Sequence, residues 1–391
     1  MEILVHYAGE IGIKGKNRPF FEKKLLDNIR SSIRKIGYKK LNKKYRRISI
    51  ELEDDNQKEK ISALLSKIPG ISYYCIAETC SLDIEEIKRT ALKLIKNLKP
   101  KTFCVATNRS NKNFKLESGE INSLVGKFIV ENTDSKVDLE HHDSVIFIEI
   151  SEDKCFVYNN KIKGLGGLPV GVTGKLIALI SGGIDSPVAS FRMMKRGCSV
   201  TLLHFFNYSK HSPNVKNKIM DLSKELSRFQ FKTKLYLINF KDIQQEIVKK
   251  IPPEFRMIVY RRLMFKIGEE ILKRESALGF ITGDSLAQVA SQTIENLSVI
   301  NEATKFPIFS PLIGTDKLEI TAEAKKIDTY DISVLPYEDC CSFLVAQHPS
   351  TKSNLEEIKK LEEKLDIKAL IGNALRNFEY LEFYSFIGAK D

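Results

Sequence analysis

Residues 175–190 read Lys-Leu-Ile-Ala-Leu-Ile-Ser-Gly-Gly-Ile-Asp-Ser-Pro-Val-Ala-Ser. The apolar run from Leu176 to Ile180 predicts a short strand that is buried on both faces. Two glycines follow at once, and Pro187 stands at a favoured first position of a helix. A strand, a glycine turn and a helix N-terminus in this order predict a phosphate site. Glycines let the backbone approach a ligand, and the free N–H groups of a helix N-terminus attract an anion.

The loop is not a Walker loop, because no lysine follows the glycines to reach the β and γ phosphates. Asp185 stands there instead, and a carboxylate beside a polyphosphate is repulsive unless Mg²⁺ bridges the two. We therefore expect Asp185 to bind Mg²⁺ together with the phosphates. The plainer alternative is an ordinary strand-to-helix turn with Ser186 as N-cap. The full pattern Ser-Gly-Gly-x-Asp-Ser after a buried strand favours the phosphate site.

Alternating strands and helices follow the loop and predict a doubly wound parallel sheet. Ligands bind such sheets at the carboxyl ends of the strands. Two of these ends carry suitable residues: His204-Phe205, which can flank an adenine, and Gly283-Asp284-Ser285, which leads to the amide-rich stretch 288–293. A core role is the plainer interpretation of Phe205. The expected strands are 175–180, 199–206, 233–240 and 277–282, and the expected helices are 187–196, 213–228, 241–250 and 254–275.

Three cations in this half are candidates for phosphate contacts. Arg261 and Arg262 lie together on the expected helix 254–275, with surface solvation as the alternative. Lys317 follows Asp316, the expected cap of a later helix, and a lysine there can neutralise a leaving pyrophosphate.

Cys340 and Cys341 are adjacent and follow two acids. A pair of buried thiols is the plain structural interpretation. A zinc site needs further Cys or His ligands at suitable spacing, which His348 alone does not provide. A disulfide between neighbours closes a strained ring. A reactive thiol that carries a persulfide therefore fits a site that activates an electrophile.

The positive charge of the chain is concentrated at its start. Residues 1–50 carry 14 Lys and Arg against 4 Asp and Glu, whereas the other 341 residues carry 48 against 46. A basic region of this kind indicates a polyanionic partner, typically a nucleic-acid backbone. The common alternative is a basic helix that only aids solubility.

Two groups of cations in the first half are candidates for RNA contacts. Lys14, Lys16 and Arg18 lie in a glycine-rich loop. Arg109 and Lys112 lie near Phe114, an aromatic that can stack on a base but is more often part of a core. The expected α+β elements are strands at 3–8, 43–52, 71–79, 101–108, 144–150 and 153–159, and helices at 19–36, 56–68, 83–97 and 117–132.

Length and composition limit the class of protein. With 391 residues, 42% of them hydrophobic, the chain can hold two or three domains with real cores. No apolar run of about 18 residues predicts a transmembrane helix, and the N-terminus does not resemble a signal peptide. Seven cysteines without regular spacing indicate reduced thiols, so we expect a cytoplasmic protein without membrane contact.

Several motifs resemble known families. Ser181–Ser186 is similar to the PP-loop of ATP pyrophosphatases, which cleave ATP between the α and β phosphates and form an adenylated intermediate. Three stretches of the first half resemble the THUMP domain, an RNA-binding module: Phe103-x-Val105-x-Thr107-x-Arg109, Val137-Asp138-Leu139 and Gly164–Gly171. Together with Lys14–Arg18, Gly283–Thr293 and Tyr337–Cys341, they make the whole chain resemble the family of tRNA 4-thiouridine synthetases (tRNA uridine 4-sulfurtransferases, ThiI type).

The resemblance implies an activity and a set of residues. The activity is ATP-dependent transfer of sulfur to the uridine at position 8 of tRNA, with a second role in sulfur supply for the thiamine thiazole. Cys341 is the first candidate for the persulfide and Cys340 for the thiol that resolves it, while Asp185 and Lys317 complete the catalytic set. The implied partners are the acceptor end of tRNA and a cysteine desulfurase as sulfur donor, and a homodimer stays open. The expected ATP contacts are Leu179, Ile180, Ser181, Gly182, Gly183, Asp185, Ser186, His204, Phe205, Arg261, Gly283 and Gln292.

The chain departs from the family pattern in several places. Asn111 replaces a usual aspartate, and His141-His142-Asp143 replaces a loop with a usual proline. Ala287 replaces a usual glycine, which is tolerable unless that position needs a positive φ. Only 50 residues, expected to be helical, follow Cys341, so no rhodanese domain fits and the chain has the short form. Some short forms bind an iron–sulfur cluster through Cys-x-x-Cys, but that motif is absent here and we expect no cluster.

Two other functions stay open. A PP-loop ligase that uses ammonia would need a glutaminase domain or partner and would leave the THUMP-like half unexplained. A non-catalytic RNA-binding protein is the second alternative, against which the intact loop and Cys341 argue. The expected domains are a ferredoxin-like domain at 1–60, a THUMP domain at 61–165, a linker at 166–174 and a PP-loop domain at 175–391.

Overall fold

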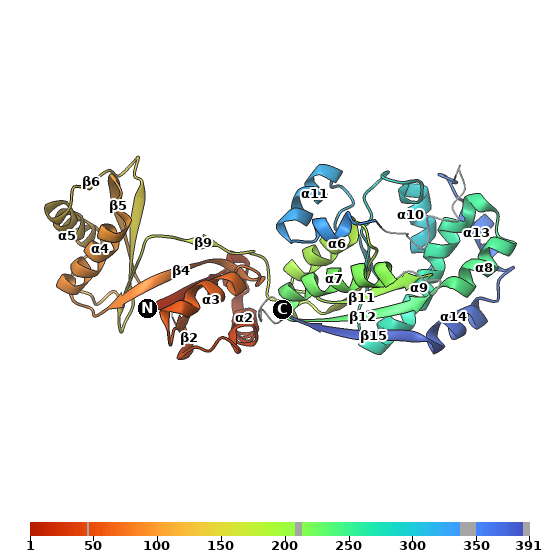
Figure 1. Ribbon diagram of the computed structural model, residues 1–391, viewed down its shortest axis with the longest axis horizontal. Helices are drawn as coiled ribbons and strands as arrows, with labels where there is room; N and C mark the ends of the chain where they lie inside the picture. The colour runs from red at the N-terminus through yellow and green to blue at the C-terminus, as the bar shows by residue number, and fades with distance from the viewer. Residues whose placement is uncertain (45–46, 208–212, 337–348, 386–391) are drawn as a thin grey trace. The chain divides into compact units, whose positions relative to one another are not determined.

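The chain forms two compact units, Met1–Leu168 and Pro169–Asp391, each with its own sheet (Figure 1). The computed structural model describes residues 1–44, 47–207, 213–336 and 349–385. No helix within these ranges is long and apolar enough to cross a membrane. The predicted domain boundaries inside the first unit stay predictions.

The first unit is built on one mixed sheet. Its elements are β1 (Glu2–Tyr7), α1 (Gly9–Gly12), η1 (Gly15–Asn17), α2 (Arg18–Ile33), β2 (Lys40–Lys44), β3 (Arg47–Glu51), η2 (Asp55–Gln57), α3 (Lys58–Leu65), β4 (Ile71–Cys80), α4 (Ile84–Leu98), β5 (Thr102–Arg109), α5 (Ser118–Asn132), β6 (Lys136–Val137), β7 (Ser144–Ile150), β8 (Cys155–Tyr158) and β9 (Ile162–Lys163). Among the described residues the strand order is β2-β3-β1-β4-β8-β7-β5-β6, and β9 pairs with β4. The single strand expected at 43–52 is instead part of a hairpin, because β2 and β3 pair antiparallel.

Strand β4 joins the two halves of this sheet. It pairs with β1 from Ile71 to Ala77 and with β8 from Glu78 to Cys80. Helix α4 covers the second half. The Asp83 carboxylate caps the helix by accepting the Glu86 N–H (3.2 Å). The helix buries Ile87, Ala91 and Ile95, which are four residues apart and face one core with residues of β5, β7 and β8.

The second unit is a sheet covered by helices on both faces. Its elements are β10 (Lys175–Leu179), α6 (Asp185–Lys195), β11 (Ser199–Phe206), α7 (Pro213–Gln230), β12 (Lys232–Asn239), α8 (Lys241–Lys250), η3 (Pro253–Phe255), α9 (Arg256–Glu275), β13 (Phe280–Ile281), η4 (Ala290–Gln292), α10 (Ile294–Asn301), β14 (Ile308–Phe309), α11 (Lys317–Lys326), α12 (Tyr330–Ser333), α13 (Leu355–Glu362), α14 (Ile367–Arg376) and β15 (Phe378–Tyr384). In the described part of the chain the strand order is β14-β13-β10-β11-β12-β15. The predicted fold class is confirmed, since β14, β13, β10, β11 and β12 pair parallel to one another.

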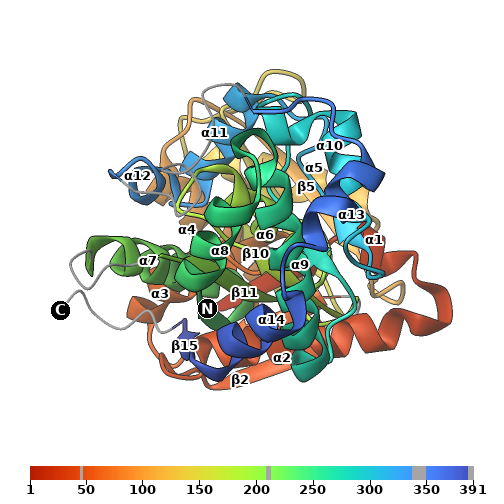
Figure 2. The same cartoon turned by 90° about the vertical axis from the view of Figure 1, so that its right-hand side faces the viewer.

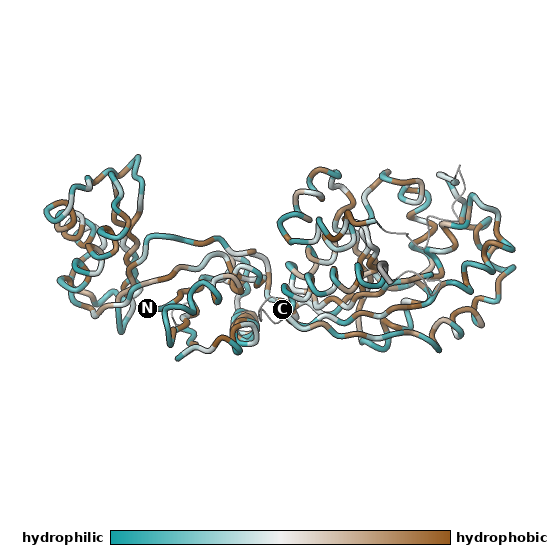
Figure 3. The backbone as a smooth tube through the Cα atoms, viewed as in Figure 1, coloured by the Kyte–Doolittle hydropathy of each residue, from teal (hydrophilic) through white to brown (hydrophobic). Residues whose placement is uncertain are grey.

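The helices form two layers (Figure 2). Helices α6, α7, α11 and α12 contact one another on one face, whereas α8, α10, α13 and α14 gather around α9 on the other. The main core lies between α9 and the sheet, where Ile177, Leu203 and Phe280 are fully buried. Apolar residues accordingly run along the strands (Figure 3).

The C-terminal segment departs from the expected helices. Residues 378–384 form β15, which pairs antiparallel with β12 and makes the edge of the sheet. The stretch Phe-Glu-Tyr-Leu-Glu-Phe-Tyr is rich in aromatic residues, which favour strands. That signal was present in the sequence, so the all-helical expectation for this segment is wrong.

Candidate active site

The loop between β10 and α6 is closed by its own serines. The Ser181 N–H donates to Ser186 Oγ (2.9 Å), and the Gly183 N–H donates to Ser181 Oγ (3.3 Å). Helix α6 begins at Asp185, two residues before the expected Pro187, and its N-cap is Ile184. The Ser186 hydroxyl therefore serves the loop, and the expectation of Ser186 as N-cap is wrong.

Gly283 brings the end of β13 against this loop. A Cβ placed on Gly283 would lie 2.8 Å from the Ser186 nitrogen, which is closer than real contacts allow. Only glycine therefore permits the approach. As a result, the second glycine–acid motif of the sequence lies beside the first at the carboxyl ends of neighbouring strands.

A pocket of ≈570 Å³ opens at these strand ends. Its walls come from the loop, the end of β11, helix α9, the stretch after β13 and the segment at 349–350. Gly182 and Gly183 belong to the loop but are not among the lining residues. The expected ATP contacts that line the pocket are Leu179, Ile180, Ser181, Asp185, Ser186, His204, Phe205, Arg261, Gly283 and Gln292.

Asp185 and Lys317 meet at this pocket, as the sequence predicted from two distant motifs. Lys317 Nζ donates to Asp185 Oδ1 (2.5 Å), and Gln288 Nε2 donates to Asp185 Oδ2 (2.9 Å). Helix α11, which starts at Lys317, is held by Arg192 of α6, whose guanidinium donates to Glu323 (2.8 Å). Both carboxylate oxygens of Asp185 are thus engaged by donors from the two loops that face it. Gln288 was not assigned this role from the sequence.

Asp284 organises the wall beside the loop. It is 5% exposed and accepts Arg261 Nη2 (2.6 Å) and Gln292 Nε2 (3.0 Å). Burial alone would raise the pKa of Asp284, but the Arg261 charge and the hydrogen bonds outweigh it and lower that pKa. Among the described residues, Gln292 Oε1 has no hydrogen-bond partner, so the amide presents an acceptor at the pocket. The sequence singled out the Gly-Asp-Ser motif but not this organising role.

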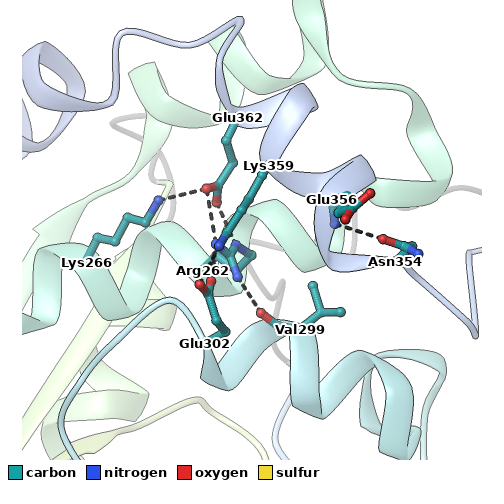
Figure 4. A network of polar contacts seen from close by, with 8 residues as sticks. All are labelled: Arg262, Lys266, Val299, Glu302, Asn354, Glu356, Lys359 and Glu362. Carbon is teal, nitrogen blue, oxygen red and sulfur yellow. Dashed lines mark hydrogen bonds and ion pairs between the residues drawn. The ribbon is translucent and has the colours of Figure 1, made fainter.

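The two arginines of α9 have different roles. Arg261 lines the pocket, whereas Arg262 is 2% exposed and forms a network with α10 and α13 (Figure 4). Its guanidinium donates to Glu362 (2.8 Å) and Glu302 (3.0 Å), and Lys266 also donates to Glu362 (2.8 Å). For Arg262 the expected phosphate contact and the expected surface solvation are both wrong, because the side chain is buried and ion-paired within the protein.

Asn296 ties two walls of the pocket together. It is fully buried, and its Nδ2 donates to the carbonyls of Ala290 (2.7 Å) and Ser350 (2.8 Å), two residues that line the pocket. Its Oδ1 accepts the Ser353 N–H (3.0 Å). Sequence reasoning missed this residue, since an asparagine in a helix carries no signal of such bonds.

The predicted RNA contacts lie in the first unit. Lys16 and Lys112 are exposed, and Lys14 Nζ lies 5.1 Å from the centre of the Phe21 ring. Arg18 Nε donates to Glu22 (2.7 Å).

Arg109 and Phe114 shape the loop that carries Lys112. Arg109 Nη1 donates to the carbonyls of Leu116 (2.6 Å) and Phe114 (3.2 Å). Phe114 packs against the core of the second half of the sheet, as its plainer interpretation predicted. Contact of Arg109 with RNA stays a prediction.

Cys340 and Cys341 lie outside the described residues, together with Tyr337, His348 and the acids between them. Within the described ranges, no group of three or more His, Cys, Asp or Glu side chains is arranged to hold a metal ion.

Comparison with known proteins agrees with the motifs along the whole chain. The family "Thiamine biosynthesis protein (ThiI)" matches residues 171–367, the ThiI ferredoxin-like domain matches 2–75 and the THUMP domain matches 82–160. A probable tRNA sulfurtransferase of Caldanaerobacter subterraneus is 44% identical over 95% of this chain and 97% of its own length. A probable tRNA sulfurtransferase of Bacillus licheniformis is 41% identical over 100% of this chain and 97% of its own length.

A solved structure is similar over the same extent. A 4-thiouridine synthetase in complex with RNA and ATP shares 34% sequence identity and a TM-score of 0.91, over 98% of this chain and 99% of its own. The resemblance inferred from the motifs is therefore confirmed, and the chain belongs to the ThiI family of tRNA sulfurtransferases.

Proposed function

We propose that the chain transfers sulfur to uridine 8 of tRNA at the expense of ATP and produces 4-thiouridine. One observation carries the proposal: Lys317 and Gln288 both donate to Asp185, an acid of the PP-loop that lines the pocket. The family membership and the full-length similarity to a 4-thiouridine synthetase support it.

The first step activates the uridine. Its O4 attacks the α-phosphate of ATP, the bond to the β-phosphate breaks, and pyrophosphate leaves. Lys317 lies 2.5 Å from Asp185 and can contact a phosphate oxygen from the same place. A fixed cation there stabilises the charge that develops on the leaving group. The adenylated O4 then departs readily, because AMP is a far better leaving group than hydroxide.

Mg²⁺ fits the residues around Asp185. One carboxylate is enough, since the ion takes its other ligands from phosphate oxygens and water. When bound, the ion would neutralise charge on the phosphates. Asp185 would hold it, and Gln288 and Lys317 would keep the carboxylate oriented toward the pocket.

The second step brings in sulfur. A persulfide on Cys341 attacks C4 of the adenylated uridine and AMP leaves, which gives a mixed disulfide. The Cys340 thiolate then attacks the Cys341 sulfur, 4-thiouridine is released, and a disulfide between the two cysteines remains for reduction. A cysteine desulfurase is the proposed donor of the persulfide sulfur, and sulfur supply for the thiamine thiazole is a proposed second role.

The first unit binds the acceptor end of the tRNA in this proposal. The support is the excess of cations in residues 1–50, with Lys14, Lys16 and Arg18 near the start of α2 and Lys112 in the second half of the sheet. We further propose a cytoplasmic protein, with a homodimer as the assembly to test.

The test is 4-thiouridine formation, followed by near-ultraviolet absorbance of tRNA incubated with protein, ATP, Mg²⁺ and sulfide. We expect product with the wild type and none with Asp185→Ala, whereas Asp331→Ala, which removes an exposed acid of α12, keeps full activity. No thionucleoside from the wild type, or an undiminished yield from Asp185→Ala, would overturn the proposal. With a cysteine desulfurase and cysteine in place of sulfide, comparing Cys340→Ala with Cys341→Ala assigns the two thiols, and equal full activity of both would remove their roles.

A further inference from the structure

Four apolar side chains stand exposed around the mouth of the ATP pocket, and we call them the apolar rim. They come from three places: the loop after β13, the loop after β14 and the first turn of α11. The rim residues and their exposed fractions are Leu286 (44%), Val289 (52%), Ile313 (41%) and Leu318 (82%).

Hydrogen bonds hold the rim around one point. The Leu286 N–H donates to the Ile313 carbonyl (3.0 Å), so the two loops lie side by side. Gln288 stands between Leu286 and Val289 in the chain, and Lys317 directly precedes Leu318. Both donate to the Asp185 carboxylate. Val289 itself lines the pocket. The rim residues therefore lie beside the two donors that hold this carboxylate.

A gathering of exposed apolar side chains differs from a single one. Leu278, at the opposite end of β13, is 63% exposed, and isolated leucines of this kind are ordinary. Exposed apolar residues that gather at the entrance of a reactive site mark a place where another molecule docks. That molecule has to bring its reacting atom to a phosphate that lies inside the pocket.

We infer that the apolar rim holds the uracil ring of the target uridine after that base has left its stack in the RNA. This inference rests on the proposed function, because it names the surface that receives the acceptor of the adenylation step. A base inside a folded RNA cannot reach a recessed phosphate, so enzymes that modify bases extrude them and pack the ring between apolar side chains. The two faces of a pyrimidine are apolar, and Val289 of the rim also lines the ATP pocket.

The test is the single-turnover release of pyrophosphate from ATP with tRNA present and sulfide absent. We expect Leu286→Ser/Leu318→Ser to slow this release about 10-fold, since each leucine loses part of its contact with the ring. Binding of a non-hydrolysable ATP analogue and binding of tRNA should both stay within about 2-fold of the wild type, because the nucleotide pocket and the phosphate contacts remain.

Two controls separate the rim from general damage. Leu278→Ser makes the same change on an exposed leucine away from the mouth and should release pyrophosphate at the wild-type rate. The single variant Leu318→Met keeps an apolar side chain at this position and should release pyrophosphate at close to the wild-type rate. A fluorescent uridine analogue at the target position should change its emission on binding the wild type and not on binding the double variant.

Wild-type release by the double variant would overturn the inference, and so would an equal loss of ATP-analogue binding, which would assign the rim to the nucleotide. Neither result touches the proposed function. That function fails if the wild type makes no 4-thiouridine or if Asp185→Ala makes as much of it as the wild type.

Discussion

The two units present their charges in opposite ways. In the second unit the charged side chains of the site are paired with one another, as in Lys317 with Asp185 and Arg261 with Asp284. In the first unit, Arg18 is paired with Glu22, but Lys16 and Lys112 stand exposed to solvent. A charge that is held at a short distance from its partner interacts strongly, and salt screens that interaction little. An exposed cation attracts phosphates over a longer distance through solvent, and salt weakens that attraction. Substitutions of charged residues in the second unit should therefore have large effects that do not depend on salt. Substitutions in the first unit should have small effects on tRNA affinity that do depend on salt.

The largest expected effect is on the buried network of the second unit. Arg262→Met should lower the free energy of unfolding by about 3–5 kcal/mol, because it leaves the Glu362 carboxylate buried without its main partner. Urea unfolding measures this loss. The double variant Arg262→Met/Glu362→Met should recover much of it, and a single variant as stable as the wild type would contradict the account of Figure 4.

The same network predicts a pH dependence. Burial would raise the pKa of Glu362, but hydrogen bonds from Arg262 and Lys266 outweigh it, so the pKa in the folded state is lowered. A carboxylate with a lowered pKa contributes stability that is complete above its unfolded-state pKa and is lost as the pH falls through the folded value. The free energy of unfolding should therefore fall on acidification, and less steeply in Glu362→Gln. Equal acid slopes for both proteins would argue against this assignment.

Next in size is the loss of Lys317, the lysine proposed to stabilise the leaving pyrophosphate. Lys317→Met should slow pyrophosphate release by about 10²–10³-fold, as expected when a fixed charge that stabilises a transition state is removed. Lys326→Met, at the exposed end of the same helix, is the matched control and should leave the rate unchanged. The ratio of the two rates should not change with salt concentration. A Lys317→Met protein with the wild-type rate would place the stabilising charge elsewhere.

The opposite behaviour is expected in the first unit. Lys16→Ala should weaken tRNA binding only several-fold and should reduce the slope of log affinity against log salt by about 1, the value for one lost phosphate contact. Fluorescence anisotropy over a range of salt concentrations gives that slope. Lys368→Ala, an exposed lysine of the second unit, should leave it unchanged. Identical slopes for Lys16→Ala and the wild type would remove the loop from the RNA contact.

The smallest effect concerns one backbone strain. Ala287 has a φ of +60°, the left-handed region in which glycine is favoured. The exception made for a positive φ therefore applies, and alanine is strained at this position. Ala287→Gly should raise the free energy of unfolding by less than about 1 kcal/mol. Glycine relieves the backbone strain in the folded state, but it also raises the entropy of the unfolded chain, which offsets most of this gain. Thermal unfolding would measure it, and a lower melting temperature would show that alanine is not strained there.

Part of the candidate site could be predicted from the sequence. The loop at 181–186 could be predicted because its glycines, serines and acid are close together in the sequence and shape the backbone locally. Asp185 and Lys317 were placed in one site from two motifs, since parallel strands bring their carboxyl ends to one edge. The cations of the first unit were found through charge alone, which says where a polyanion binds but not which side chain contacts it.

Other features had no local signal. Arg262 and Glu362 are 100 residues apart in sequence, so their pairing follows only from the packing of α9 against α13. Neighbouring Arg261 and Arg262 look alike in the sequence, yet the rotation of about 100° between successive helix residues sends one to the pocket and the other into the core. Asn296 donates to the backbone carbonyls of Ala290 and Ser350. Every residue has a backbone carbonyl, so the side chains at these positions give no sign of the contact. By contrast, β15 had a signal in its aromatic residues, and the helical expectation overlooked it.

The central claim is that the PP-loop cleaves ATP between the α and β phosphates to activate a tRNA uridine. The most direct measurement is the identity and amount of the nucleotide products per 4-thiouridine formed, resolved by chromatography of reactions with labelled ATP. The account predicts one AMP and one pyrophosphate for each 4-thiouridine, with neither product formed by Asp185→Ala. Formation of ADP and phosphate in step with 4-thiouridine would contradict it.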